Sequence, residues 1–501
     1  MAENDLNALD ATFLELEEAD QSAHMHIGAV MLFKPPPGQR APSLERVRAD
    51  LDARLASLPR FRQRLSEPRT GGLRWPRWLD DERFDIARHV RAAALPAPAG
   101  EQELREWAGE YFSQRLDRAR PLWEIIVIEL GDGRWAMVTK THHCMVDGVG
   151  SVDIGQTILD PEPDMSRFAA AEDPASADRP PAVAATRSTA RRLGALPLAA
   201  GAAGLRVARF GIGVARGAAD IALSGVGVAI HPERGREALR RSRAMAEVLV
   251  RDELIAAPPT SLNEPIGAAR RLAVIEVPLD ELKGIKRSLG GTVNDVVLAV
   301  TAGGIRRLFE HRGESPPRAG VRAMVPVNIR SAAERLALGN RITSLFVHLP
   351  VAEPDPLRRY ELQIDEAEGL KAGTQALGSR EIIDLAAHAP PVIHTFLARS
   401  LFATRLFNVT ITNVPGPQMP LYALGSRMRA VWPLVPLAAD HALGVAVFSY
   451  DGRVFFCLNA ARDSVPDLDV VADGIAESIA ELVKLAEPAH HPARRAAVSR
   501  A

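Results

Sequence analysis

The strongest constraint on the fold is a predicted β-hairpin in the first third of the chain. Residues 124–130 form an apolar run rich in Ile and Val, which is typical of a buried strand. Residues 131–133, Gly-Asp-Gly, have the composition of a turn, and residues 134–141 predict the returning strand. The hairpin leads directly into two adjacent histidines, His142 and His143. Any fold for this chain must therefore place both histidines at the end of a buried strand.

The two histidines are predicted to face opposite sides of the sheet, because neighbouring side chains alternate along a strand. His143 shares its side with Met137, Thr139 and Thr141. We therefore expect one histidine to face a substrate site and the other, His142, to pack or to support the structure.

The pattern His-His-x-x-x-Asp-Gly over residues 142–148 suits acyl transfer to a hydroxyl group. A neutral imidazole can take the proton from an alcohol that attacks a thioester, because its pKa lies near the working pH. We predict that His143 is this general base. Asp147 would orient the histidine or pair with an arginine, and Gly148 would allow a close backbone approach.

Three other interpretations of this stretch are weighed against acyl transfer. The histidines could form a satisfied pair in the core, with Asp147 and Gly148 as an ordinary turn. A metal site is less favoured, because the histidines are adjacent and no dense cluster of Cys, His or carboxylates accompanies them. Cys144 lies in the motif and resembles a nucleophile by position. No base lies on the side of the strand that Cys144 faces, so we expect Cys144 to have a packing role.

Several further stretches, together with the histidine motif, resemble a known family. They are Pro-Leu-Trp-Glu at 121–124, the run from Asn294 and Asp295 to residue 299, Val-Pro-Val-Asn at 325–328 and Thr-Asn-Val-Pro-Gly-Pro at 412–417. In type and order they resemble the bacterial bifunctional wax ester synthase/acyl-CoA:diacylglycerol acyltransferase family, within the superfamily of CoA-dependent acyltransferases. The resemblance runs from about residue 9 to about residue 485.

The resemblance implies an α/β (α+β) fold of two chloramphenicol-acetyltransferase-like domains. Each would be a mostly antiparallel or mixed sheet with helices, and the active site would lie in a tunnel between them. The donor would be acyl-CoA and the acceptor diacylglycerol, giving triacylglycerol, or a long-chain alcohol, giving a wax ester. The chemistry would need no metal or redox cofactor.

The resemblance also makes Asn294 and Asp295 important for activity. Asp295 has a structural explanation as well, because Thr292 and Asp295 match a capping box at the start of a helix. We expect a supporting role for both residues rather than proton transfer.

The predicted domain organisation has four parts. Residues 1–160 form the N-terminal domain with the histidine motif, residues 161–264 a linker, residues 265–487 the C-terminal domain and residues 488–501 a disordered tail. Within the linker, residues 187–243 contain a basic amphipathic pattern that suits either a membrane or lipid-droplet surface or a crossover helix packed on the protein.

Composition limits the partners and the compartment. The 501 residues carry a net charge of −1, which gives no basic field for nucleic acid. Two cysteines are typical of a reducing compartment. No signal-peptide pattern and no apolar run of the roughly 20 residues that a spanning helix needs are present. We expect a cytoplasmic protein, peripherally associated with the inner membrane or lipid droplets.

Two groups of alternatives stay open. His24 and His26 belong to a predicted strand at 24–33, where a direct catalytic role is the alternative to the favoured strand-end histidine. In function, a condensation-type or polyketide-ester acyltransferase with a carrier-protein donor is the first alternative. A non-catalytic lipid-binding or droplet-coating protein is the second.

Overall fold

The structure is a computed structural model, and it describes residues 6, 8–20, 22–67, 76–145, 155, 157–163, 257–328, 342–376 and 406–487. The chain divides into two compact units, one of residues 1–165 and 256–501 and the other of residues 166–255. The second unit, with the predicted amphipathic segment, lies outside the described residues, as does the predicted tail.

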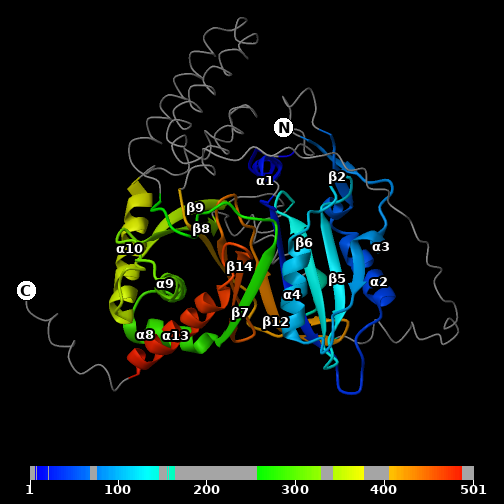
Figure 1. Cartoon of the computed structure of the whole chain (residues 1–501). Helices are drawn as coiled ribbons and strands as arrows, with labels where there is room; N and C mark the ends of the chain where they lie inside the picture. The colour runs from blue at the N-terminus through cyan, green and yellow to red at the C-terminus, as the bar shows by residue number, and fades with distance from the viewer. Residues whose placement is uncertain are drawn as a thin grey trace, which may run out of the picture. The chain divides into compact units, whose positions relative to one another are not determined.

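The first half of the chain builds most of one sheet (Figure 1). Its elements are α1 (Ala8–Ala19), β1 (His26–Lys34), α2 (Leu44–Leu55), a 3-10 turn (Pro59–Arg62), β2 (Gln63–Leu65), β3 (Trp78–Asp80), α3 (Ile86–His89), β4 (Val90–Ala93), α4 (Glu101–Phe112), β5 (Trp123–Glu129) and β6 (Trp135–His142). The predicted hairpin is confirmed as β5 and β6, which pair antiparallel. Gly133 in its turn has φ +83°, which a residue with a side chain rarely adopts.

The first sheet has the order β11-β12-β1-β6-β5-β4. Its pairs are antiparallel except for β4 with β5. The strands β11 (Tyr422–Ala423) and β12 (Ser426–Leu434) come from the second half of the chain, and β12 pairs along the length of β1. The hydrophobic patterns did not predict that strands of the second half join this sheet, because local periodicity does not show which distant strands pair.

The second half builds the other sheet, in the order β7-β14-β13-β10-β8-β9. Here β10 runs parallel to β13 and β8, and the other pairs are antiparallel. The remaining elements are β7 (Arg270–Pro278), α8 (Leu279–Leu289), α9 (Val293–His311), β8 (Val321–Asn328), β9 (Ile342–Leu349), α10 (Pro356–Ala376), β10 (Val409–Pro415), β13 (Leu443–Tyr450), β14 (Arg453–Ala461) and α13 (Leu468–Ala486).

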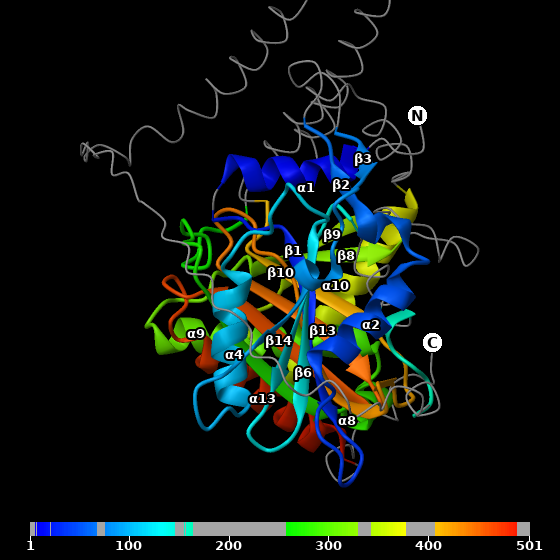
Figure 2. The same ribbon diagram turned by 90° about the vertical axis from the view of Figure 1, so that its right-hand side faces the viewer.

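Helices α8, α9, α10 and α13 lie together on one face of the second sheet (Figures 1 and 2). The contact of α9 with α13 depends on small residues. A Cβ on Gly304 would lie 2.6 Å from Cγ1 of Ile475, and one on Gly474 would lie 3.0 Å from Cα of Gly304. The two backbones therefore approach closely enough to seal the apolar core of this half.

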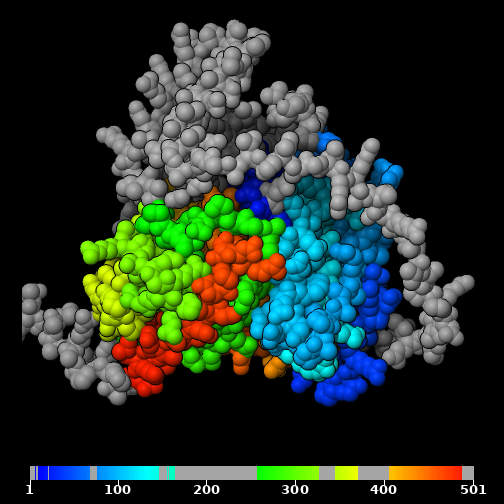
Figure 3. All heavy atoms as spheres, viewed as in Figure 1, coloured from blue at the N-terminus to red at the C-terminus, as the bar shows by residue number. Residues whose placement is uncertain are grey.

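Helix α4 connects the two halves. Phe112 packs against Gly28 of β1, where a Cβ would lie 2.8 Å from the Phe112 ring, and Gly109 lies against the Arg270 backbone of β7. Figure 3 shows the side chains of this helix, in cyan, beside those of the second half. Two mixed sheets with helices confirm the predicted α/β fold class.

Among the described residues, no single helix is long and apolar enough to cross a membrane. Taken together, α8 and α9 have the length and the apolar composition of a spanning segment, but the pair is bent by 101° at the break between them.

Candidate active site

The hairpin ends in a tight turn that places the two histidines in different surroundings. His142 is the last residue of β6, and its side chain is buried. His143 follows in the turn and is partly exposed, like Thr139 and Thr141 on the same side of the strand. This is the difference that the alternation of side chains predicts.

The orientation of the His142 ring is fixed by its two nitrogens. Nδ1 accepts a hydrogen bond from the Cys144 backbone N–H at 3.1 Å, so the neutral ring carries its proton on Nε2. Nε2 lies 3.6 Å from Oε2 of Glu17, too far for a hydrogen bond but close enough for attraction between the N–H and the carboxylate. Burial lowers the pKa of His142 and keeps the ring neutral, although Glu17 opposes this shift.

His143 is held by its backbone and by its ring. Its N–H donates a hydrogen bond to the Met25 carbonyl at 2.8 Å. Its ring stacks on the Phe13 ring of α1, with 4.0 Å between centroids and 15° between planes. His143 is thus a partly exposed residue whose ring plane is fixed, which is compatible with a general base.

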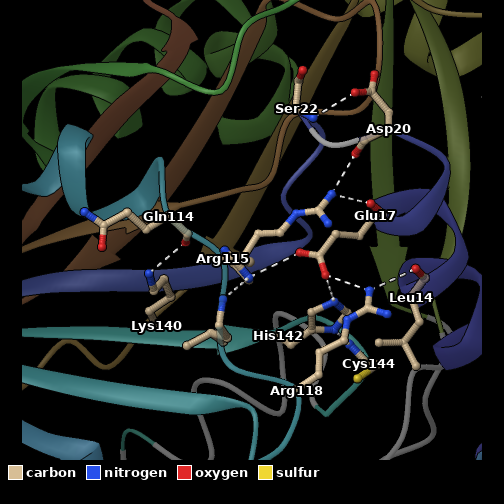
Figure 4. A network of polar contacts seen from close by, with 12 residues as sticks. Leu14, Glu17, Asp20, Ser22, Gln114, Arg115, Arg118, Lys140, His142 and Cys144 are labelled. Atoms are coloured by element: carbon tan, nitrogen blue, oxygen red, sulfur yellow. Dashed lines mark hydrogen bonds and ion pairs between the residues drawn. The ribbon is translucent and has the colours of Figure 1, made fainter. Parts of the chain in front are cut away.

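A buried polar cluster surrounds His142 (Figure 4). The Glu17 side chain is 2% exposed and accepts a hydrogen bond from Nη2 of Arg118 at 2.7 Å. Its Oε1 lies 3.4 Å from Nε2 of His26, which is the cross-strand partner of His142. Burial alone would raise the pKa of Glu17, but the nearby His142 N–H and the hydrogen bond from Arg118 lower it, so the carboxylate is ionised.

Two neighbours of the histidines have structural surroundings. The Cys144 thiol is buried, and burial raises its pKa well above the usual value, so it lacks the thiolate that a nucleophile requires. Lys140 is buried two residues before His142 and donates to the carbonyls of Tyr111 and Gln114, each at 3.0 Å. Burial lowers the pKa of Lys140 to about 8.

Asn294 and Asp295 open α9 beside the end of β10. The predicted capping box is confirmed: Asp295 Oδ2 accepts from the N–H and the hydroxyl of Thr292, each at 2.8 Å, and Asp295 N–H donates to Thr292 Oγ1. Asn294 Oδ1 accepts from Nδ2 of Asn413 at 3.3 Å. The structure thus brings together two of the stretches that carry the family resemblance, the one at 294–299 and the one at 412–417.

Two predicted site residues, Asp147 and Gly148, lie outside the described residues. The chain that follows them is anchored where it is described. Nη2 of Arg54 donates to Asp160 at 2.7 Å, and Nη1 donates to the Thr157 carbonyl at 3.2 Å. Within the described ranges, no group of three or more His, Cys, Asp or Glu side chains is placed to hold a metal ion.

Comparison with known proteins places this geometry in a family. Residues 6–297 match the family described as the wax ester synthase/diacylglycerol acyltransferase catalytic domain, and residues 338–483 match its C-terminal domain. A probable diacylglycerol O-acyltransferase of Mycobacterium tuberculosis is 32% identical over 99% of both chains. The chain belongs to the wax ester synthase/diacylglycerol acyltransferase family.

Solved structures agree with this family and its fold. The wax ester synthase/diacylglycerol acyltransferase of Marinobacter aquaeolei is 26% identical, with a TM-score of 0.65 over 96% of this chain and 99% of that one. The first condensation domain of the calcium-dependent antibiotic synthetase is 16% identical, with a TM-score of 0.58 over 97% of both chains. At that identity the second likeness extends to the fold alone.

Sequence reasoning did not find the residues of α1 that contact the family motif. The sequence predicts only an entry segment over residues 9–18, whereas the structure has a helix whose Phe13 and Glu17 meet the two histidines. One signal was present: Glu17 follows the apolar Phe13 by four residues and Leu14 by three, so a helix here would place its carboxylate on the apolar face.

Proposed function

We propose that this chain is an O-acyltransferase that moves a fatty acyl group from acyl-CoA to diacylglycerol, forming triacylglycerol, with His143 as the general base. Family membership supports the reaction class. The observation that carries the role of His143 is the contrast within the motif: His142 is buried beside a carboxylate, while His143 is partly exposed with its ring plane fixed.

In the proposed reaction, the His143 imidazole takes the proton of the acceptor hydroxyl as the oxygen attacks the thioester carbonyl. The tetrahedral oxyanion then collapses, the C–S bond breaks, and the imidazolium returns the proton to the departing thiolate of coenzyme A. Proton transfer of this kind contributes roughly 10²–10⁴-fold to a rate. Positioning of both substrates and stabilisation of the oxyanion supply the remainder.

The other predicted site residues have supporting roles in this proposal. His142 fixes the turn through Cys144, and we propose that Asp147 and Gly148 support the motif. Asp295 caps α9 and thereby orders Asn294, which contacts Asn413. The reaction as proposed requires no metal or redox cofactor.

Long-chain alcohols are the second proposed acceptors. The Marinobacter relative carries both activities in its name, and ester formation on an alcohol uses the same proton transfer. Both acceptors are lipids, so we further propose that the protein acts in the cytoplasm and associates peripherally with the inner membrane or with lipid droplets.

The test is an assay of purified protein with labelled palmitoyl-CoA and either dioleoylglycerol or hexadecanol, with His143→Ala in parallel. Triacylglycerol or wax ester from the wild type, lost in the variant, is the expected result. A reaction that proceeds only with an acyl-carrier protein as donor would favour the condensation-type alternative. Binding to lipid without any ester product would favour a lipid-binding protein.

A further inference from the structure

The helix α1 contacts both histidines of the motif with one face. Phe13 and Glu17 are four residues apart, so they lie one above the other on the helix. Phe13 stacks on the His143 ring, and Glu17 lies beside Nε2 of His142. A single helical turn therefore touches the proposed base and its buried neighbour at once.

The burial of Glu17 is difficult to explain by stability alone. A carboxylate loses favourable hydration when it is buried, and an apolar side chain of similar volume in its place is often neutral or stabilising. Glu17 is nevertheless 2% exposed, with an arginine and two histidines around it. Its position suggests a role in the geometry of the motif.

The orientation of the His142 ring beside Glu17 affects the turn that carries His143. With its proton on Nε2 facing Glu17, the His142 ring presents an unprotonated Nδ1 to the Cys144 N–H. The His142 carbonyl also accepts from the Met145 N–H at 3.0 Å. His142 thus fixes the backbone that follows His143, and the Met25 carbonyl fixes the N–H of His143 itself.

The end of α1 is itself anchored by the segment that follows α4 (Figure 4). Arg118 binds Glu17, Glu18 and the Leu14 carbonyl, and Arg115 binds the carbonyls of Glu17 and Asp20. Cations near the C-terminus of a helix are favourable because the last carbonyls have no partner within the helix. Glu17 therefore has a defined position relative to His142.

We propose that α1 is the positioning element of the active site, in which Glu17 orients His142 and Phe13 sets the ring plane of His143. This inference rests on the proposed function, because it assumes that His143 acts as the base. Glu17 and Phe13 are positioning residues: they act through the histidines.

The test compares Glu17→Gln with Glu18→Gln in transfer from palmitoyl-CoA to dioleoylglycerol by the full chain. Glu18 is a matched control, since it lies on the same helix and binds the same Arg118, at 2.6 Å, but its side chain is 55% exposed. We expect Glu17→Gln to lower kcat by about 10- to 100-fold with KM for palmitoyl-CoA within about twofold, because small displacements of reacting groups have effects of this size. Glu18→Gln should leave both constants within about twofold of the wild type.

If Glu17 had only a structural role, Glu17→Gln would lower the midpoint of thermal unfolding and leave kcat of the folded protein unchanged. A selective fall in kcat would therefore indicate a positioning role. A Glu17→Gln protein with wild-type kcat would overturn the proposal. If that variant fails to fold, Phe13→Leu decides, because leucine keeps the apolar bulk and removes the stacking. A fall in kcat of about threefold or more at constant KM supports the proposal, and an unchanged kcat overturns it.

Failure of this inference can be separated from failure of the proposed function. If His143→Ala is inactive while Glu17→Gln and Phe13→Leu match the wild type, only the role of α1 is wrong. If His143→Ala keeps wild-type activity, the general-base assignment is wrong, and the positioning proposal fails with it.

Discussion

The two six-stranded sheets of this protein differ in what they bury. The second sheet and its helices enclose an extensive apolar core. The first sheet, at the end of β1 and β6, buries Glu17, His24, His26 and His142 in addition to apolar residues. Burying an ionisable group lowers the stability of the folded protein unless the group is paired. The concentration of such groups beside the family motif therefore suggests that these residues serve to position the motif and not to stabilise the fold.

The second half has buried polar groups too, and several of them have backbone carbonyls as partners. Both ring nitrogens of His441 face carbonyls, Ala439 O at 2.6 Å from Nδ1 and Phe407 O at 3.1 Å from Nε2. Asn408 donates to the Pro258 carbonyl and to Asn263. Such contacts hold loops in place, whereas the contacts of Glu17 orient a side chain next to the proposed base.

The largest effect on stability should come from the apolar core of the second half. Phe309, near the end of α9, is 1% exposed. Phe309→Ala should lower the free energy of unfolding by about 3–5 kcal/mol, because it removes buried apolar surface and leaves a cavity. Urea denaturation measures the loss, and the specific activity of the folded protein should stay within about twofold of the wild type. A selective loss of activity at unchanged stability would contradict the view that the second-half core supplies stability and the first half positions the motif.

Acidification should act mainly on the first half. Burial lowers the pKa of His26, His89 and His142, all in the first sheet and its helices, and of His441 in the second half. Below the unfolded pKa of about 6.5, the unfolded chain binds protons that the folded chain excludes, so stability falls as the pH falls.

Each such histidine contributes a slope of up to about 1.4 kcal/mol per pH unit. The depressed pKa of Glu17 acts in the same direction, but only below its unfolded pKa of about 4.3. Denaturation at pH 5, 6 and 7 measures the slope, and His89→Gln should reduce it. A free energy of unfolding that is constant or increases towards pH 5 would show that these rings are not buried neutral.

The smallest effect should come from the helix cap of α9. Asp295→Ala removes the acceptor for the N–H and the hydroxyl of Thr292, which should lower the free energy of unfolding by about 0.5–2 kcal/mol. The fall in kcat/KM should be smaller than that of His143→Ala, because Asp295 orders Asn294 without touching the acceptor proton. Thermal unfolding and steady-state rates measure both quantities. An inactive Asp295→Ala protein with wild-type stability would instead place Asp295 in the chemistry.

Local sequence patterns predicted the structural elements that depend on residues close together in the chain. The hairpin of β5 and β6 and the capping box at Thr292 depend on residues within a few positions of one another, and the structure has both. Strand alternation also predicted the different surroundings of His142 and His143. The participation of β12 in the first sheet was not predictable in this way, because β1 and β12 are almost 400 residues apart.

The same limit applies to the site. The motif and its resemblance to a family identify both histidines, but Glu17 and Phe13 reach them only through the docking of α1 against the end of β6. Arg118, which fixes that docking at 2.7 Å from Glu17, lies about 100 residues further along the chain. A contact of this kind depends on tertiary packing and leaves no periodic trace in either segment.

The division of roles between the adjacent histidines is the central claim, and His142→Gln compared with His143→Gln tests it most directly. Acyl-transfer rates and thermal unfolding are measured on both purified variants. We predict that His143→Gln loses about 100-fold or more in kcat/KM at an unchanged unfolding midpoint, because it removes the base. His142→Gln should lower the midpoint by several degrees and lose less activity. A His143→Gln protein that retains its rate, or a His142→Gln protein that is the more inactive while equally stable, would contradict the account.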